Sequence, residues 1–178
     1  FLNKVYNESH FVNAVDVTAL CSSDFSKLEQ VRQNVLFSTS DYAQLLDKVD
    51  AVYIHSHPDL HAKQIQQALE AGKHVLYESP MVMEKEQYTE LTALARQRNL
   101  ILMEGIRTAY MLAYSRLLLL VKSGKIGRVV SVDATCTSLS MYENYGLHSK
   151  KWGSMEDWGP TALLPVFQIL GTDYTDVD

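Results

Sequence analysis

Residues 50–80 decide the fold. They read Asp50-Ala51-Val52-Tyr53-Ile54, then His55-Ser56-His57-Pro58-Asp59-Leu60-His61, then a helical pattern to Gly72, then Lys73-His74-Val75-Leu76-Tyr77-Glu78-Ser79-Pro80. This order predicts a strand over 51–54, a polar loop, a helix over 59–71 and a second strand over 74–77. Parallel strands joined by a helix end at one edge of a sheet, and such sheets bind ligands outside that carboxyl edge. The two polar loops are therefore predicted to form a site together.

The same alternation continues on both sides of this βαβ unit. Strands are predicted over 15–21, 35–37 and 100–103, and helices over 25–34, 41–46 and 85–98. Ser23 or Asp24 is expected to cap the helix over 25–34, and Ser40 or Asp41 the next one. Strands and helices that alternate in this way predict an α/β fold, a doubly wound parallel sheet over residues 1–105.

The pattern changes after Gly105. A helix is predicted over 109–122, a long strand of alternating polarity over 129–139, a polar aromatic loop over 142–152 and a last helix over 160–170. Alternation indicates a sheet with one dry face, unlike the earlier strands. We therefore expect residues 106–178 to form part of a second α/β domain with an open sheet.

One element of a dinucleotide-binding sheet is missing from the pattern. Such a sheet begins with a strand and a glycine-rich turn that receives the pyrophosphate, whereas the first glycine of this chain is Gly72. Without that strand, the strands over 15–21 and 51–54 would flank a gap of unpaired backbone groups. Likewise, the strand over 129–139 cannot form a sheet alone. We expect the chain to be part of a longer protein, incomplete at both ends.

Composition excludes several classes of partner. The chain has 178 residues and a formal net charge of -5, with no basic block, so neither nucleic acid nor an anionic membrane is an expected partner. The longest aliphatic run, over 117–121, is too short to span a bilayer, and no signal peptide is visible. Cys21 and Cys136 lie in or at the ends of apolar runs and are expected to be buried, reduced thiols of a cytoplasmic protein.

With these residues in view, the chain resembles the Gfo/Idh/MocA family of NAD(P)-dependent sugar oxidoreductases. The resemblance rests on the strand over 51–54 with its loop to His61, on Ala68-Leu69-Glu70-Ala71-Gly72-Lys73-His74-Val75-Leu76, on Glu78-Ser79-Pro80, on Met103-Glu104-Gly105, on Ser123-Gly124-Lys125-Ile126-Gly127 and on Asp157-Trp158-Gly159. It implies a Rossmann domain that binds NAD or NADP, and a second domain whose open sheet often mediates homo-oligomerisation. A sugar-like substrate would lie between them, and hydride would pass between its carbon and the nicotinamide.

The chain departs from this family at its proton carriers. The lysine of the family's Glu-Lys-Pro is Ser79, the usual histidine falls on Thr161, and the expected arginine falls on Ala109. Loss of a positioned acid or base costs about 10²- to 10⁴-fold in rate. Either other groups carry the proton, or the protein binds cofactor and turns over little.

The candidate catalytic residues are Glu78, Tyr110 and Asp157. The candidate cofactor-binding residues are those that follow predicted strands: Ser22, Ser23, Ser56, His57, His61, Glu78 and Ser79. His57 is a further candidate proton carrier. The alternatives are structural, since Ser23, Glu78 and Asp157 could each merely cap a helix.

The string His55-x-His57-x-Asp59-x-His61 permits a different interpretation. Histidines and a carboxylate on a loop are ordinary zinc or iron ligands, and the string comes within one residue of a metallo-hydrolase pattern. The surrounding strand–helix–strand pattern explains His61 without a metal, so we expect no metal site and keep a metal-dependent hydrolase as the weaker alternative. The other alternative is a homologue that binds the cofactor without turnover.

Overall fold

The computed structural model describes residues 5–81, 84–137 and 154–176. The chain divides into two compact units, Phe1–Glu104 and Gly105–Asp178, and each is described by itself. The predicted loop over 142–152 lies outside the described residues.

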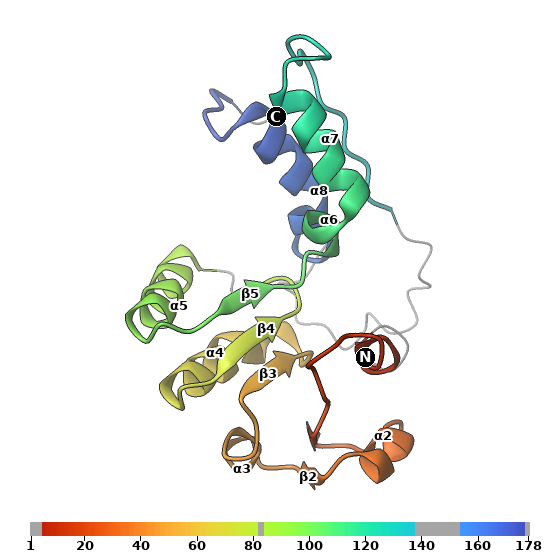
Figure 1. The fold of residues 1–178 in the computed structure, drawn as a ribbon. Coiled ribbons are helices and arrows are strands. Elements are labelled where there is room, and N and C mark those ends of the chain that lie inside the picture. Colours follow the sequence, from red (N-terminus) through yellow and green to blue (C-terminus); the bar gives the residue numbers. More distant parts are fainter. Residues whose placement is uncertain (1–4, 82–83, 138–153, 177–178) are drawn as a thin grey trace. The chain divides into compact units, whose positions relative to one another are not determined.

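The first unit is an α/β unit built on parallel strands (Figure 1). Its strands are β1 (Ala19–Cys21), β2 (Phe37–Thr39), β3 (Ala51–Ile54), β4 (His74–Tyr77) and β5 (Leu102–Glu104). Its helices are α1 (Asn7–Ser9), α2 (Glu29–Asn34), α3 (Tyr42–Leu46), the 3₁₀ turn η2 (Pro58–Leu60), α4 (His61–Glu70) and α5 (Lys85–Gln97). This confirms the α/β fold class and the βαβ unit over 50–80.

The strands form two sheets rather than one. β1 pairs with β2, and β4 lies between β3 and β5, with every pairing parallel. No ladder joins β1 to β3 within the described part of the chain. That break lies where the sequence predicts a gap of unpaired backbone groups.

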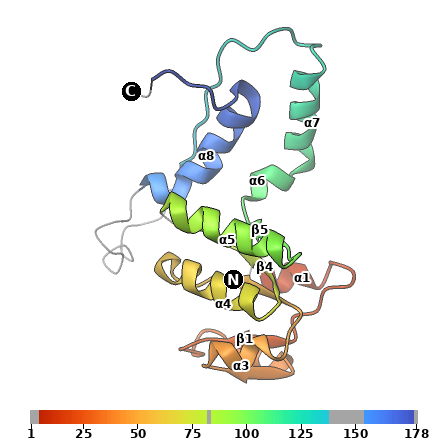
Figure 2. The same cartoon turned by 90° about the vertical axis from the view of Figure 1, so that its left-hand side faces the viewer.

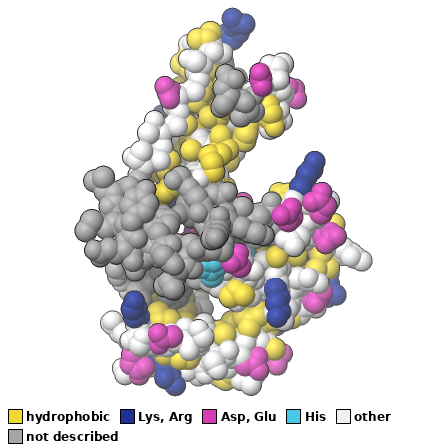
Figure 3. Space-filling view, turned by 180° about the vertical axis from the view of Figure 1, so that it is seen from behind, with side chains coloured by type: hydrophobic (Ala, Val, Ile, Leu, Met, Phe, Trp, Pro, Cys, Tyr) yellow, Lys and Arg dark blue, Asp and Glu magenta, His cyan; other side chains and the backbone are white. Residues whose placement is uncertain are grey.

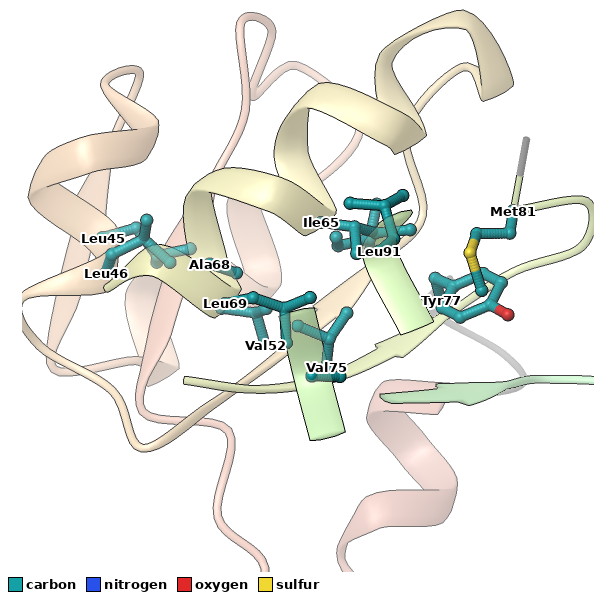
Figure 4. Packing of buried hydrophobic residues seen from close by; sticks show 12 residues of the cluster. Leu45, Leu46, Val52, Ile65, Ala68, Leu69, Val75, Tyr77, Met81 and Leu91 are labelled. Atoms are coloured by element: carbon teal, nitrogen blue, oxygen red, sulfur yellow. The ribbon is translucent and has the colours of Figure 1, made fainter. Parts of the chain in front are cut away.

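Helix α4 forms the centre of the core. It lies beside α5 against the sheet of β3, β4 and β5 (Figure 2), and its apolar residues recur at helical spacing as Ile65, Ala68 and Leu69, all fully buried. They pack with Val52 and Val75 of the neighbouring strands (Figure 4). This packing fixes the direction of β3 and β4 and thereby the edge at which both strands end.

Helix boundaries follow local hydrogen bonding. Asp41 caps α3 as predicted, because its carboxylate accepts from the backbone N–H groups of Ala43 and Gln44. The predicted cap of the helix over 25–34 is wrong: Asp24 accepts from Ser26 instead, and α2 begins only at Glu29. The carboxylate is already used in this turn, so the first helical turn forms further along.

The second unit contains α6 (Arg107–Tyr110), α7 (Leu112–Lys122) and α8 (Ser154–Leu170). The predicted helix over 109–122 is split, because Met111 has extended backbone angles of φ -71° and ψ 130°. The hydroxyl of Tyr114 in α7 donates to Gln168 in α8 at 2.8 Å. Apolar side chains gather on the surface of this unit (Figure 3). Leu112 of α7 is 84% exposed.

The strand predicted over 129–139 does not form within 129–137, the part that the structure describes. An isolated strand leaves its backbone groups without a ladder, and the described residues of this unit provide no second strand. The predicted open sheet is therefore not present in the described part of 106–178.

No helix among the described residues is long and apolar enough to cross a membrane. Cys21 and Cys136 are free thiols, but both are half-buried rather than buried as predicted. Burial, with a smaller contribution from Asp41, raises the pKa of the Cys21 thiol.

Candidate functional site

The loops that follow β3 and β4 lie side by side, as the sequence predicts. Ile54 is paired with Tyr77 at the ends of the two strands, and the backbone N–H of Glu78 extends the ladder by donating to the Ile54 carbonyl at 3.0 Å. His55–His57 and Glu78–Pro80 consequently share the carboxyl edge of one sheet. This is where a parallel α/β sheet presents its ligand-binding groups.

Glu78 is held by a tyrosine of the neighbouring strand. The Tyr53 hydroxyl donates a short hydrogen bond to the Glu78 carboxylate. The Tyr53 ring lies 6.0 Å from the His55 ring between centroids. Desolvation of the His55 ring lowers its pKa although much of the residue is exposed, and the nearby charge of Glu78 partly opposes that shift. Glu78 is therefore an oriented carboxylate at the edge.

The hydroxyl of Ser79 lies at the same edge. Its hydroxyl oxygen is buried and has no hydrogen-bond partner among the described residues. The hydroxyl of Ser56, by contrast, donates to the side-chain oxygen of Gln64 in α4. A buried hydroxyl without a partner is costly, so a ligand group that reached the Ser79 hydroxyl would supply the missing hydrogen bond.

His61 lies behind the edge rather than on it. It begins α4, is 1% exposed, and places Nδ1 2.8 Å from the Pro80 carbonyl oxygen and Nε2 3.1 Å from that of Ser56. Both ring nitrogens therefore face the protein itself.

His57 is the N-cap residue of the 3₁₀ turn η2. Its Nδ1 lies 3.4 Å from the Asp59 backbone nitrogen and 3.3 Å from the Asp59 carboxylate. No group of three histidine, cysteine or carboxylate side chains that could hold a metal ion occurs in the described ranges. Although the string over 55–61 places its histidines in one segment, His61 points inward, and the hydrolase alternative gains no support.

Ser22 and Ser23 follow β1, as predicted. The Ser22 hydroxyl donates to the Asp24 carbonyl at 2.6 Å, and Ser23 is exposed. The Asp24 carboxylate accepts from Ser26, and these bonds lower the pKa of Asp24. The turn after β1 thus presents one exposed hydroxyl and an ionised carboxylate.

The remaining predicted residues belong to the second unit. Tyr110 ends α6 with its side chain exposed. Asp157 lies in the first turn of α8, and its side chain is outside the described part of the structure. The structure thus brings Ser56, His57, Glu78 and Ser79 together at one edge.

Two partners of these residues were not predicted. Tyr53 orients Glu78, and Gln64 accepts from Ser56. The sequence could have indicated Tyr53, because its hydroxyl is the one polar side-chain group in the strand Ala51–Ile54. Gln64 gives no such signal, since it is one of three glutamines in a short helix.

Residues 1–106 match the oxidoreductase family Gfo/Idh/MocA, described as having an NAD-binding Rossmann fold. A dTDP-3,4-didehydro-2,6-dideoxy-alpha-D-glucose 3-reductase from Actinomadura kijaniata is 34% identical over 125 residues. That alignment covers 68% of this chain and 38% of the reductase, so the chain spans well under half the length of this relative.

Solved structures show the same fold. A 3-ketoreductase from Actinomadura kijaniata, in complex with NADP and TDP-benzene, is 30% identical with a TM-score of 0.62, over 69% of this chain and 39% of that one. A scyllo-inositol dehydrogenase from Lactobacillus casei, with bound NAD(H) and scyllo-inositol, is 26% identical with a TM-score of 0.62, over 68% of this chain and 37% of that one.

Proposed function

The chain belongs to the Gfo/Idh/MocA oxidoreductase family with an NAD-binding Rossmann fold, and from this premise we propose that it serves NAD(P)-dependent hydride transfer on a sugar- or cyclitol-like alcohol or ketone. The observation that carries the proposal is the shared edge of β3 and β4, where Glu78 is oriented and the Ser79 hydroxyl is buried without a partner among the described residues. The solved relatives in complex with NADP and with NAD(H) support the cofactor class.

The residues at this edge fit the nicotinamide end of such a cofactor. Ser56, His57, Glu78 and Ser79 offer hydroxyl, imidazole and carboxylate groups to its polar atoms, and Ser22 and Ser23, which follow β1, are the proposed contacts of the adenosine ribose. Residues 1–71 contain no glycine, so a glycine-rich pyrophosphate turn is not among them. When bound, the nicotinamide supplies the hydride chemistry itself.

The chain's own contribution is to place the substrate and to move one proton. Oxidation of an alcohol removes a hydride from carbon and a proton from oxygen, and that proton needs an acceptor. Glu78, Tyr110 and Asp157 are the proposed carriers in place of the family's lysine and histidine. The Tyr53 hydroxyl, which donates to Glu78, holds this carboxylate in place at the edge.

A second candidate is a cofactor-binding homologue with little or no turnover. It is favoured by Ser79 and Thr161, because neither hydroxyl is an effective proton carrier at neutral pH. The two candidates share the binding step and differ only in turnover.

The test uses the longest form of the protein that its gene encodes. Thermal unfolding with NAD and NADP measures binding, since a ligand at about 100 times its Kd stabilises by about 2.7 kcal/mol. Absorbance of the reduced nicotinamide with a panel of sugars and cyclitols measures turnover. Binding with turnover supports the oxidoreductase, binding without turnover supports the second candidate, and no binding refutes both. A gain of activity in Ser79→Lys would identify a degenerated dehydrogenase.

We also propose self-association through the second unit in a cytoplasmic protein. The apolar residues exposed on α7 and α8, which include Leu119, Leu163 and Phe167, support an interface there. Sedimentation at several concentrations tests it, and a monomer at every concentration would refute it.

A further inference from the structure

His61 combines two properties that point to a role inside the protein. Apart from tyrosines, it is the only residue with a polar side chain that is buried as a whole among the described residues, and each of its ring nitrogens faces a backbone carbonyl. One carbonyl belongs to Ser56 in the loop after β3, and the other to Pro80 in the loop after β4. The ring therefore bridges the two loops of the proposed site from the inside.

The chemistry of the ring limits how this bridge can form. A carbonyl oxygen only accepts, and a neutral imidazole has one donor and one acceptor nitrogen. A neutral His61 would satisfy one carbonyl and direct a lone pair at the other. Only a ring with a hydrogen on each nitrogen donates to both, and the charged form also makes the stronger hydrogen bonds. The titratable groups of the same loops are His55, His57, Asp59 and Glu78.

We propose that His61 is a positioning residue, a two-ended donor that ties the loop after β3 to the loop after β4 and thereby fixes Ser79 and Glu78 relative to Ser56. The consequence for catalysis rests on the proposed function, whereas the tie itself does not. Glu78 is already fixed on its other side by its backbone bond to Ile54. The segment Glu78–Pro80 is thus held at both ends, with the Ser79 hydroxyl between them.

The tie can be tested without cofactor. Isotope-labelled histidine in nuclear magnetic resonance shows which ring nitrogens carry a hydrogen, and His61 is expected to show one on each. His74 is the internal control: its Nδ1 accepts from the Ile101 backbone N–H at 3.0 Å and must lack a hydrogen. A His61 ring with one bare nitrogen would overturn the proposal.

The catalytic consequence is tested with three variants. His61→Phe removes both donors, and His61→Gln retains amide donors. Leu69→Ala is the control, because it disturbs the same helix at a fully buried side chain that has no polar group to bond to Ser56 or Pro80. We expect kcat to fall about 10²-fold in His61→Phe, the size of effect of a misplacement of about 1 Å, and to recover in part in His61→Gln. Leu69→Ala is expected to lower stability and to leave kcat within about twofold, well short of a positioning loss.

The outcomes separate this proposal from the proposed function. Equal kcat losses in His61→Phe and Leu69→Ala would show a merely structural role and overturn the positioning role. If the parent protein binds no NAD(P)H, the proposed function fails. The hydrogens found on the His61 ring nitrogens then still decide whether His61 ties the two loops together. If His61→Phe does not fold, His61→Gln and the resonance experiment carry the test.

Discussion

Replacing Ser79 with alanine should stabilise the protein while weakening its ligand binding. Its hydroxyl oxygen is buried without a partner among the described residues, and such a group costs about 1–3 kcal/mol. The void left by one oxygen, roughly 15 Å³, costs only about 0.4 kcal/mol at about 24 cal/mol per Å³. The net expectation is a gain of about 0.5–2.5 kcal/mol in the free energy of unfolding of the first unit.

Ligand binding should change in the opposite direction. A hydroxyl that bonds to the ligand contributes about 0.5–1.5 kcal/mol, so Ser79→Ala should raise the Kd of NAD(P)H by about 2- to 12-fold. Ser56→Ala is the matched control for the change in stability, because its hydroxyl already bonds to Gln64. That variant should lose about 1 kcal/mol of stability by leaving the Gln64 oxygen without its donor.

Two assays check both parts. Hydrogen exchange of the α4 amides reports the unfolding free energy of the first unit alone, which matters because a chain of two units need not unfold in one step. Fluorescence titration with NAD(P)H reports the Kd. A Ser79→Ala variant that loses more than about 1 kcal/mol of stability and keeps its Kd would refute the reasoning, since its hydroxyl would then be bonded inside the protein.

Further predictions concern the same unit. Tyr53→Phe should lower the free energy of unfolding by about 1.5 kcal/mol in urea titration, because the Glu78 carboxylate loses a hydrogen bond. Leu69→Ala should cost about 2–5 kcal/mol by the same measurement, as a fully buried side chain leaves a cavity. Gly72→Ala should cost about 1–2 kcal/mol, all of it from a φ of +76°, since a Cβ there meets no atom within 4 Å. His55 titrates below its ordinary pKa of 6.5, so the unfolded state takes up its proton first, and stability should fall as pH decreases from 6.5 to the lowered pKa. His55→Asn should remove that part of the pH dependence, and an unchanged profile would contradict the assignment.

Much of the first unit could be predicted because its local signals agree. The strand over 51–54, the helix that ends before Gly72 and the strand over 74–77 were each indicated by composition and periodicity, and their parallel pairing follows from the helix between them. Ser40 or Asp41 is predicted as a cap from residue type, and the Asp41 side chain does accept from two N–H groups of the next turn. In these places, propensity and tertiary packing favour the same structure.

The sequence fails at one place where a distant partner decides the structure and at two places where the local signals do not decide it. Residues 129–137 alternate like a strand, but pairing requires a second strand that alternation cannot supply. The break at Met111 has no glycine or proline to signal it. Asp24 is a residue type that commonly caps helices, but its carboxylate accepts from Ser26 instead. Local bonds of this kind compete with helix capping.

The site was predicted as a location more than as a set of roles. The adjacency of the loops after β3 and β4 follows from topology alone. The direction of each side chain does not, because residues in irregular loops have no fixed period. The sequence predicts His61 near the cofactor but not that its ring is buried behind the edge, and it gives no role to Tyr53, which orients Glu78.

Ser79 alters the charge of this edge more than its architecture. The backbone of Glu78–Pro80 is fixed by the bond to Ile54 on one side and by His61 on the other, and neither contact involves the side chain at position 79. A lysine there would place a cation next to Glu78, whose carboxylate here meets the neutral donor Tyr53. The edge thus keeps a negative charge that lysine would offset, and a negative edge attracts a cationic ring more than a neutral one. Under the proposed function, position 79 would then bias the site toward the oxidised, positively charged nicotinamide without any change in the loops that hold it.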